Sequence, residues 1–77
     1  MSPGGRRLRN GRAQQALRAF QRLGYETVRV RGSHHILKHP HRGMLVLPMH
    51  RGTIKVGLLL NAIERAGVSP EDFEELL

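Results

Sequence analysis

The chain has 77 residues, no cysteine and a formal net charge of +7. This length allows one domain with a small core, and the absence of cysteine excludes a disulfide framework, a thiolate metal site and a cysteine nucleophile. No apolar run approaches the length of a membrane span or of a signal-peptide core, so we expect a soluble cytoplasmic protein without a membrane partner.

The charge is distributed unevenly along the chain. Twelve of the thirteen Lys and Arg residues precede Glu64, whereas five of the six acids lie at or after it. A basic body attracts polyanions, and nucleic acid is the commonest of these. An arginine-rich, solvated surface without such a partner is the alternative that composition leaves open.

The N-terminal part of the chain divides into an arm and a helix. Residues 1–9 combine Ser-Pro-Gly-Gly with three arginines and show no periodicity, which predicts a flexible basic arm ahead of a single domain at residues 10–77. Asn10 is the expected N-cap of the helix, and Gly24 is its expected left-handed C-terminal residue. Apolar residues between them recur at helical spacing and should face the core: Ala13, Ala16, Leu17, Phe20 and Leu23.

A hairpin is predicted next. Val28 and Val30 alternate with Arg29 and Arg31, which is typical of a strand with one buried and one solvent-exposed face. Gly32-Ser33 then predicts a tight turn, followed by a second strand over residues 34–38. The turn should set the two strands side by side and hold a histidine near cationic side chains.

The rest of the chain predicts one more strand and two helices. The near-continuous apolar run 44–47 indicates the best-buried strand, and Pro48 ends it. A helix follows, with a core-facing stripe that ends at Gly67: Leu59, Ala62, Ile63 and Ala66. Ser69 and Pro70 are a strong start signal for a short third helix.

These elements occur in the order α-β-β-β-α with a short C-terminal helix. Because short turns join the strands, they should form a three-stranded antiparallel sheet with the helices on one face. The fold class that the sequence predicts is therefore α+β.

Four segments together resemble the HicA toxins, the YcfA-like mRNA interferases, over about residues 8–77. They are Gly32-Ser33-His34-His35 after a basic strand, Lys38-His39-Pro40, Pro48-Met49-His50, and residues 54–59 at the entry to the second long helix. The resemblance implies a double-stranded-RNA-binding-like fold, mRNA cleavage without a metal or other cofactor, and neutralisation by a HicB-type antitoxin.

The resemblance also implies roles for particular residues. His34 matches the catalytic histidine, and Gly32 and Ser33 match the turn that presents it. Met49 and Leu58 stand where the family usually has a small aliphatic residue and a threonine. Both departures are apolar, so they affect the expected local packing and capping rather than the fold.

A histidine suits RNA cleavage for a reason independent of the family. The ordinary pKa of imidazole lies near neutrality, so the ring can take the proton of a 2′-hydroxyl or donate one to the leaving 5′-oxygen. Nearby cations would hold the phosphate and stabilise its developing charge. The candidate RNA-binding residues are Arg29, Arg31, Gly32, Ser33, Lys38 and His50.

The other histidines have simpler interpretations. His35 neighbours His34 on a strand, so the two rings should point to opposite faces, and His35 is expected to pack. His39 and His41 are interpreted as solvated turn residues, since neither cysteine nor a convergent carboxylate accompanies them in a metal site. For His50 a plain loop role is as plausible as a contact with phosphate.

Three function classes remain open: the metal-independent endoribonuclease toxin, a non-catalytic module that binds structured RNA, and an interaction domain for an acidic protein partner. Only the first requires His34.

The chain has no Trp and one Tyr, and both Phe residues lie on apolar stripes, so recognition by base stacking is not expected and sequence specificity should be low.

Overall fold

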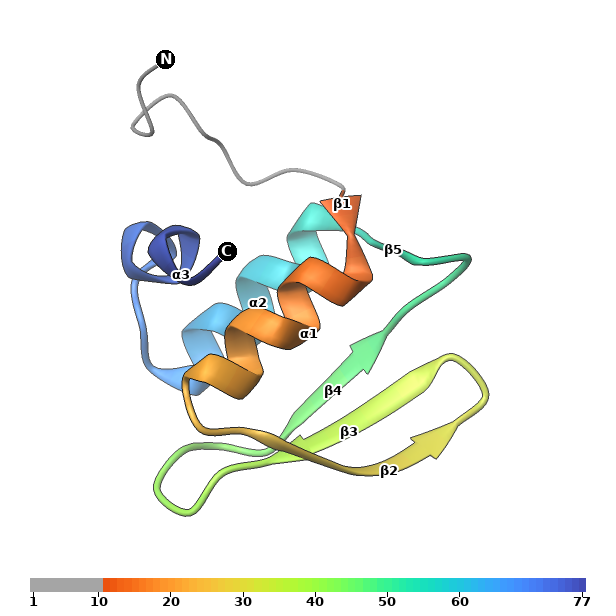
Figure 1. Cartoon of the computed structure of the whole chain (residues 1–77), viewed down its shortest axis with the longest axis horizontal. Helices are drawn as coiled ribbons and strands as arrows, with labels where there is room; N and C mark the ends of the chain where they lie inside the picture. The colour runs from red at the N-terminus through yellow and green to blue at the C-terminus, as the bar shows by residue number, and fades with distance from the viewer. Residues whose placement is uncertain (1–10) are drawn as a thin grey trace.

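The computed structural model describes residues 11–77 (Figure 1). Strands β2 (Glu26–Arg31), β3 (His34–Lys38) and β4 (Leu45–Pro48) form an antiparallel sheet in the order β2-β3-β4. Helices α1 (Ala13–Arg22), α2 (Val56–Ala66) and α3 (Pro70–Leu76) lie together on one side of it. The predicted α+β architecture is confirmed. The predicted arm over residues 1–9 and the predicted N-cap at Asn10 lie outside the described residues.

A second, very small sheet joins the starts of the two long helices. Strand β1 (Gly11–Arg12) precedes α1 directly, and β5 (Thr53–Ile54) lies just before α2. They pair antiparallel, with Gly11 opposite Ile54 and Arg12 opposite Thr53. Two-residue strands carry no readable periodicity, so the sequence pattern did not predict this sheet.

The core lies between the helices and the inner face of the three-stranded sheet. Phe20 of α1 and Phe73 of α3 are fully buried, with ring centroids 4.6 Å apart, and Tyr25 meets Phe20 edge-on at 5.8 Å. Leu37, Leu45 and Leu47 are the sheet's buried leucines. The aromatic side chains are thus used for packing and do not lie on the surface.

The predicted helix ends are confirmed where the structure describes them. Gly24 after α1 and Gly67 at the C-cap of α2 have positive φ values of 111° and 81°. The Ser69 hydroxyl accepts a hydrogen bond of 3.1 Å from the Asp72 backbone N–H and so caps α3.

Strand β4 is the best-buried strand of the sheet, as predicted, although only one of its faces is covered. Leu45 and Leu47 are buried, while Val46 and Met44, which lies just before the strand, are about half exposed. In β2, Val28 and Val30 are 50% and 54% exposed, so the prediction of a buried face was wrong. The reason is the position of the helices. Helix α2 packs against β4, which forms one edge of the sheet, whereas β2 forms the opposite edge.

A register shift adds to the exposure of β2. Thr27 pairs with Leu37 and Arg29 with Ile36, which leaves Val28 as the extra residue of a β-bulge. Bulges of this kind are common on edge strands, where they discourage pairing with another chain.

Within the described residues, no helix is long and apolar enough to cross a membrane.

Candidate nucleic-acid interface

The turn between β2 and β3 consists of two residues, Gly32 and Ser33. Gly32 has a φ of 57°, while Ser33 does not have a positive φ, which is the pattern of a type II′ hairpin turn. A Cβ atom added to Gly32 would meet no other atom within 4 Å, so the backbone conformation, and not crowding, requires glycine here. This turn places Arg31 directly opposite His34.

The face of the sheet turned away from the helices is cationic. In β3, Leu37 and His35 point toward the helices, so His34, Ile36 and Lys38 point the other way. Cross-strand partners share a face, which adds Arg31 opposite His34 and Arg29 opposite Ile36. We call this surface the cationic face; it comprises Arg29, Arg31, His34 and Lys38, all of them exposed.

Within this face, Arg31 is the positively charged residue that lies next to His34, because strands β2 and β3 pair these two residues. Directly opposed residues in antiparallel strands have Cβ atoms about 5 Å apart, so the Arg31 guanidinium and the His34 ring can contact the same small group. Lys38 lies at the other end of β3, about 13 Å along the strand, and is paired with the acidic Glu26. The structure thus separates Lys38 from His34.

The end of β4 completes the surroundings of His34. Pro48 is the cross-strand partner of His34, and the Met49 backbone N–H donates a 2.8 Å hydrogen bond to the Ser33 carbonyl. This bond ties the residues after β4 to the Gly32-Ser33 turn. His50 follows Met49 directly and is exposed, so the structure places it next to the hairpin tip as well.

His35 points to the opposite face, as predicted. It lies opposite Val30 and Leu47 and is half-buried. Its Nδ1 atom is buried without a hydrogen-bond partner. His35 therefore belongs to the packing layer and does not line the same surface as His34.

His39 is not a solvated turn residue, so that interpretation was wrong. The His39 side chain is half-buried, with Nε2 3.0 Å from the Leu23 carbonyl oxygen. Its Nδ1 accepts a 2.9 Å hydrogen bond from the His41 backbone N–H, so the neutral ring must carry its proton on Nε2 and donate it to Leu23. The ring also lies edge-on to Tyr25, at 5.0 Å. His39 fastens its loop to the end of α1, while the His41 side chain is exposed.

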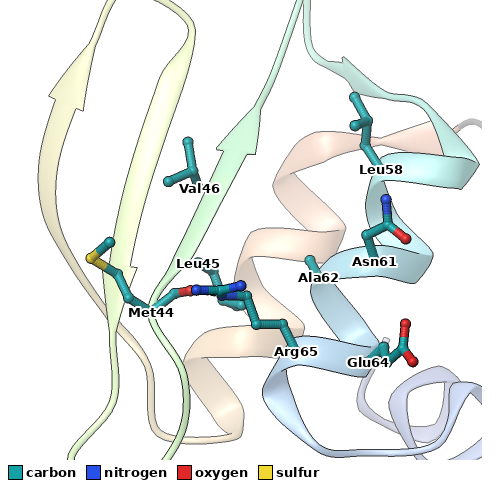
Figure 2. Close-up of a pocket in the computed structure, with 8 residues that line it drawn as sticks. All are labelled: Met44, Leu45, Val46, Leu58, Asn61, Ala62, Glu64 and Arg65. Atoms are coloured by element: carbon teal, nitrogen blue, oxygen red, sulfur yellow. The ribbon is translucent and has the colours of Figure 1, made fainter.

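A groove of about 540 Å³ lies between β4 and α2, and the sequence pattern did not predict it. Figure 2 shows the side chains that line this groove. Arg65 reaches across it and donates its Nε–H to the Met44 carbonyl at 2.8 Å. The lining is mainly apolar and includes no histidine: Met44, Leu45, Val46, Leu58, Asn61, Ala62, Glu64 and Arg65. The groove therefore offers no imidazole for acid–base chemistry near neutral pH, whereas the cationic face includes His34.

A tight turn follows β4, and the sequence pattern did not predict it. Arg51 and Gly52 have φ values of 54° and 76°, which is typical of a two-residue type I′ turn. His50 and Thr53 flank it and exchange backbone hydrogen bonds of 3.0 and 2.9 Å. The sequence does contain a local signal for this turn, because Arg51 is followed by glycine and the two flanking residues can pair as strand residues.

Among residues 11–77, no three His, Cys, Asp or Glu side chains gather in a way that could hold a metal ion. The helix-backed sheet and its exposed cationic face define a small basic α+β protein with the architecture of double-stranded-RNA-binding domains. The family model described as the HicA toxin of bacterial toxin–antitoxin systems matches residues 13–68. The chain belongs to this family, and its resemblance to HicA is confirmed. A comparison with curated proteins gave no match.

Proposed function

We propose that this toxin is a metal-independent endoribonuclease that cleaves mRNA in the cytoplasm and uses His34 as its acid–base group. One observation carries the proposal: an exposed histidine stands directly opposite an exposed arginine, Arg31, on the cationic face of a chain from a toxin family. The matched residues 13–68 include this hairpin.

The proposed reaction is an intramolecular transfer at phosphorus. The 2′-hydroxyl of one nucleotide attacks its own 3′-phosphate, so a bond forms between O2′ and phosphorus while the bond from phosphorus to O5′ breaks. One proton must leave O2′ and one must reach O5′. His34 handles one of these transfers, water handles the other, and positioned proton transfer of this kind contributes about 10²- to 10⁴-fold to the rate.

Arg31 supplies the electrostatic part of the proposed mechanism. Its guanidinium carries several N–H donors in a fixed plane and matches phosphate geometry, so it holds the scissile phosphate beside the His34 ring. Arg29 lies two residues further along β2 on the same face and is placed for a neighbouring phosphate. Lys38, far along β3, would contact RNA only at a distance from the cleaved bond.

Recognition in this proposal is electrostatic and indifferent to sequence. Phe20, Tyr25 and Phe73 are buried, so these three rings are not available for base stacking. The contacts that remain go mainly to phosphates, which fix the position of RNA without reading its bases. A non-catalytic module for structured RNA would use the same face, and only the chemistry at His34 separates the two functions.

The family implies an antitoxin partner, and we propose a HicB-type protein that covers the surface around His34 and Arg31. An acidic surface on that protein would exclude RNA both sterically and by charge. Hydrogen exchange of the complex tests the location: protection is expected in residues 29–38. Protection confined to α3 would contradict it.

The enzymatic proposal is tested by incubating the purified toxin with mRNA in the presence of a chelator. Cleavage is expected to continue, because no metal takes part in the proposed chemistry. Expression of the wild type alone should arrest growth, whereas His34→Ala should not. His41→Ala is the matched control, since His41 is an exposed histidine on the loop before β4, and it should remain toxic. An intact wild type that cleaves no RNA would favour the non-catalytic module.

A further inference from the structure

Arg51 has an unusual backbone conformation. Within residues 11–77 it is the one non-glycine residue with a positive φ, 54°. A side chain other than that of Gly, Asn or Asp is uncommon in this left-handed region, because Cβ crowds the backbone there. The Asn-Gly sequence that type I′ turns prefer would form the same turn with less strain. The turn itself therefore gives no reason for an arginine.

The strained residue is held by a well-anchored turn. His50 and Thr53 exchange two backbone hydrogen bonds across it, and the Thr53 hydroxyl donates a further bond of 2.8 Å to the His50 carbonyl. The Gly52 carbonyl accepts a 2.8 Å bond from the N–H of Ala13, the first residue of α1. Pairing of Thr53 with Arg12 adds β1 to this support. A strained conformation persists only where its surroundings determine it in this way, and such positions cluster at binding sites.

The anchored turn lies at the same end of the molecule as His34. Figure 1 shows the tip of the β2–β3 hairpin and the turn between β4 and β5 at one edge of the fold. Pro48 is the cross-strand partner of His34, and only three residue steps separate it from Arg51. The Cα atom of Arg51 thus lies within about 17 Å of that of His34, since each step spans at most about 3.8 Å and the strands are about 5 Å apart.

We infer that Arg51 is a phosphate-binding residue that holds the RNA backbone on one side of the cleaved bond. This inference rests on the proposed function. In it, Arg31 holds the scissile phosphate beside His34, and Arg51 holds a phosphate of a neighbouring nucleotide from the second turn. One arginine at the end of β2 and one in the anchored turn after β4 together fix the direction of the RNA strand across His34, which one contact alone does not do. Thr53 and Lys55, both exposed, extend the polar surface beyond Arg51.

The test compares Arg51→Asn with Arg51→Lys, both made in a His34→Ala background so that a labelled single-stranded RNA oligonucleotide binds without being cleaved. Asparagine suits the left-handed conformation and removes the charge, so the variant should melt at the same temperature as its parent or above it. Its affinity for RNA should nevertheless fall about 3- to 10-fold at low salt. The slope of log K against log salt should become shallower by about 0.7, the value for one lost contact to single-stranded nucleic acid. Arg51→Lys should keep most of the affinity and the slope.

Arg18→Gln is the matched control, because it removes one positive charge from an exposed position on α1. It should change the affinity less than twofold and leave the slope unaltered. If Arg51→Asn binds like its parent, or no more weakly than Arg18→Gln, Arg51 does not contact phosphate and the inference is wrong. That result would leave the proposed nuclease function in place, because the nuclease function is tested separately. Its test is whether the His34→Ala protein, with Arg51 unchanged, has lost RNA cleavage. Cleavage by His34→Ala would overturn the proposed function while leaving the measured role of Arg51 in binding in place.

Discussion

Arg31 and His34 lie directly opposite each other across a two-residue turn, on the face of the sheet that the helices leave uncovered. Neither side chain contributes to the core, and both are exposed. Substitutions at exposed positions like these usually change the free energy of unfolding by no more than about 0.5 kcal/mol. The proposed roles of this pair in binding and chemistry can therefore be tested by substitution without unfolding the protein.

Arg31→Gln should weaken RNA binding and make it less dependent on salt. We expect an affinity several-fold lower at low salt and a shallower slope of log K against log salt, because one phosphate contact and its released counterion are lost. Fluorescence anisotropy over a salt series measures both. A wild-type affinity that does not change between low and physiological salt would remove the case for a phosphate-binding face.

Gly32→Ala should destabilise the hairpin even though there is space for a methyl group. The φ of 57° is strained for alanine, so we expect a loss of at least about 1 kcal/mol in the free energy of unfolding, together with slower RNA cleavage because His34 is displaced. Gly57→Ala is the matched control. A Cβ there also meets nothing within 4 Å, φ is not positive, and the residue lies in α2, where alanine is favoured. Equal effects of the two substitutions in denaturant titrations would show that the turn does not need glycine.

Gly24 and His39 should be energetically coupled. Gly24 has a φ of 111°, and an added Cβ would lie 2.7 Å from the His39 Nε2 atom. Gly24→Ala should cost about 2 kcal/mol, from backbone strain and from displacement of the ring that bonds the Leu23 carbonyl. Once His39→Ala has removed the ring, adding Gly24→Ala should cost less, with a coupling of about 0.5–1 kcal/mol in a double-mutant cycle. Strictly additive effects would indicate that the ring does not occupy this position in solution.

Tyr25 should make the fold sensitive to alkaline pH. Burial raises the pKa of its phenol, although the positive charges of Arg42 and Arg65 oppose the shift. Its hydroxyl donates a 2.7 Å hydrogen bond to the Gly43 carbonyl, which the phenolate cannot do. Since the folded pKa lies above the unfolded value of about 10, this contribution to stability is fully present below pH 10 and is lost as the pH rises through the folded pKa.

Ultraviolet titration measures this directly, because Tyr25 is the single tyrosine of the chain. The folded protein should titrate above the value found in denaturant. Tyr25→Phe should lose about 1 kcal/mol of stability at neutral pH and show a flatter stability profile above pH 10. A phenol that titrates at the same pH in both states would contradict the burial argument.

The local signals in the sequence were enough to predict the three helices, the three strands of the main sheet and the hairpin that carries the candidate site. An alternating run interrupted by Gly32-Ser33 predicts the hairpin and therefore the pairing that brings a basic residue to His34. Ser69 and Gly67 likewise mark helix ends through short-range backbone chemistry. These features depend on residues a few positions apart, so a single sequence contains them.

The features that were missed depend on contacts between distant residues. Val30 is exposed because of where the helices pack on the sheet, and the alternation of residues in β2 does not determine that position. The role of His39 requires the Leu23 carbonyl, 16 residues earlier. The pairing of β1 with β5 likewise joins Arg12 to Thr53, far apart along the chain. The turn at Arg51 is the exception, since the Arg51-Gly52 sequence is a local signal for it.

The central claim is that His34 carries the chemistry while the fold does not depend on it. The most direct measurement is the rate constant for RNA cleavage at saturating RNA by His34→Ala, compared with the wild type and with His41→Ala, after circular dichroism and melting temperature have shown all three to be equally folded. We predict a rate at least about 10²-fold lower for His34→Ala, RNA affinity close to that of the wild type, and a normal rate for His41→Ala. A folded His34→Ala protein that cleaves RNA at the wild-type rate would contradict the account.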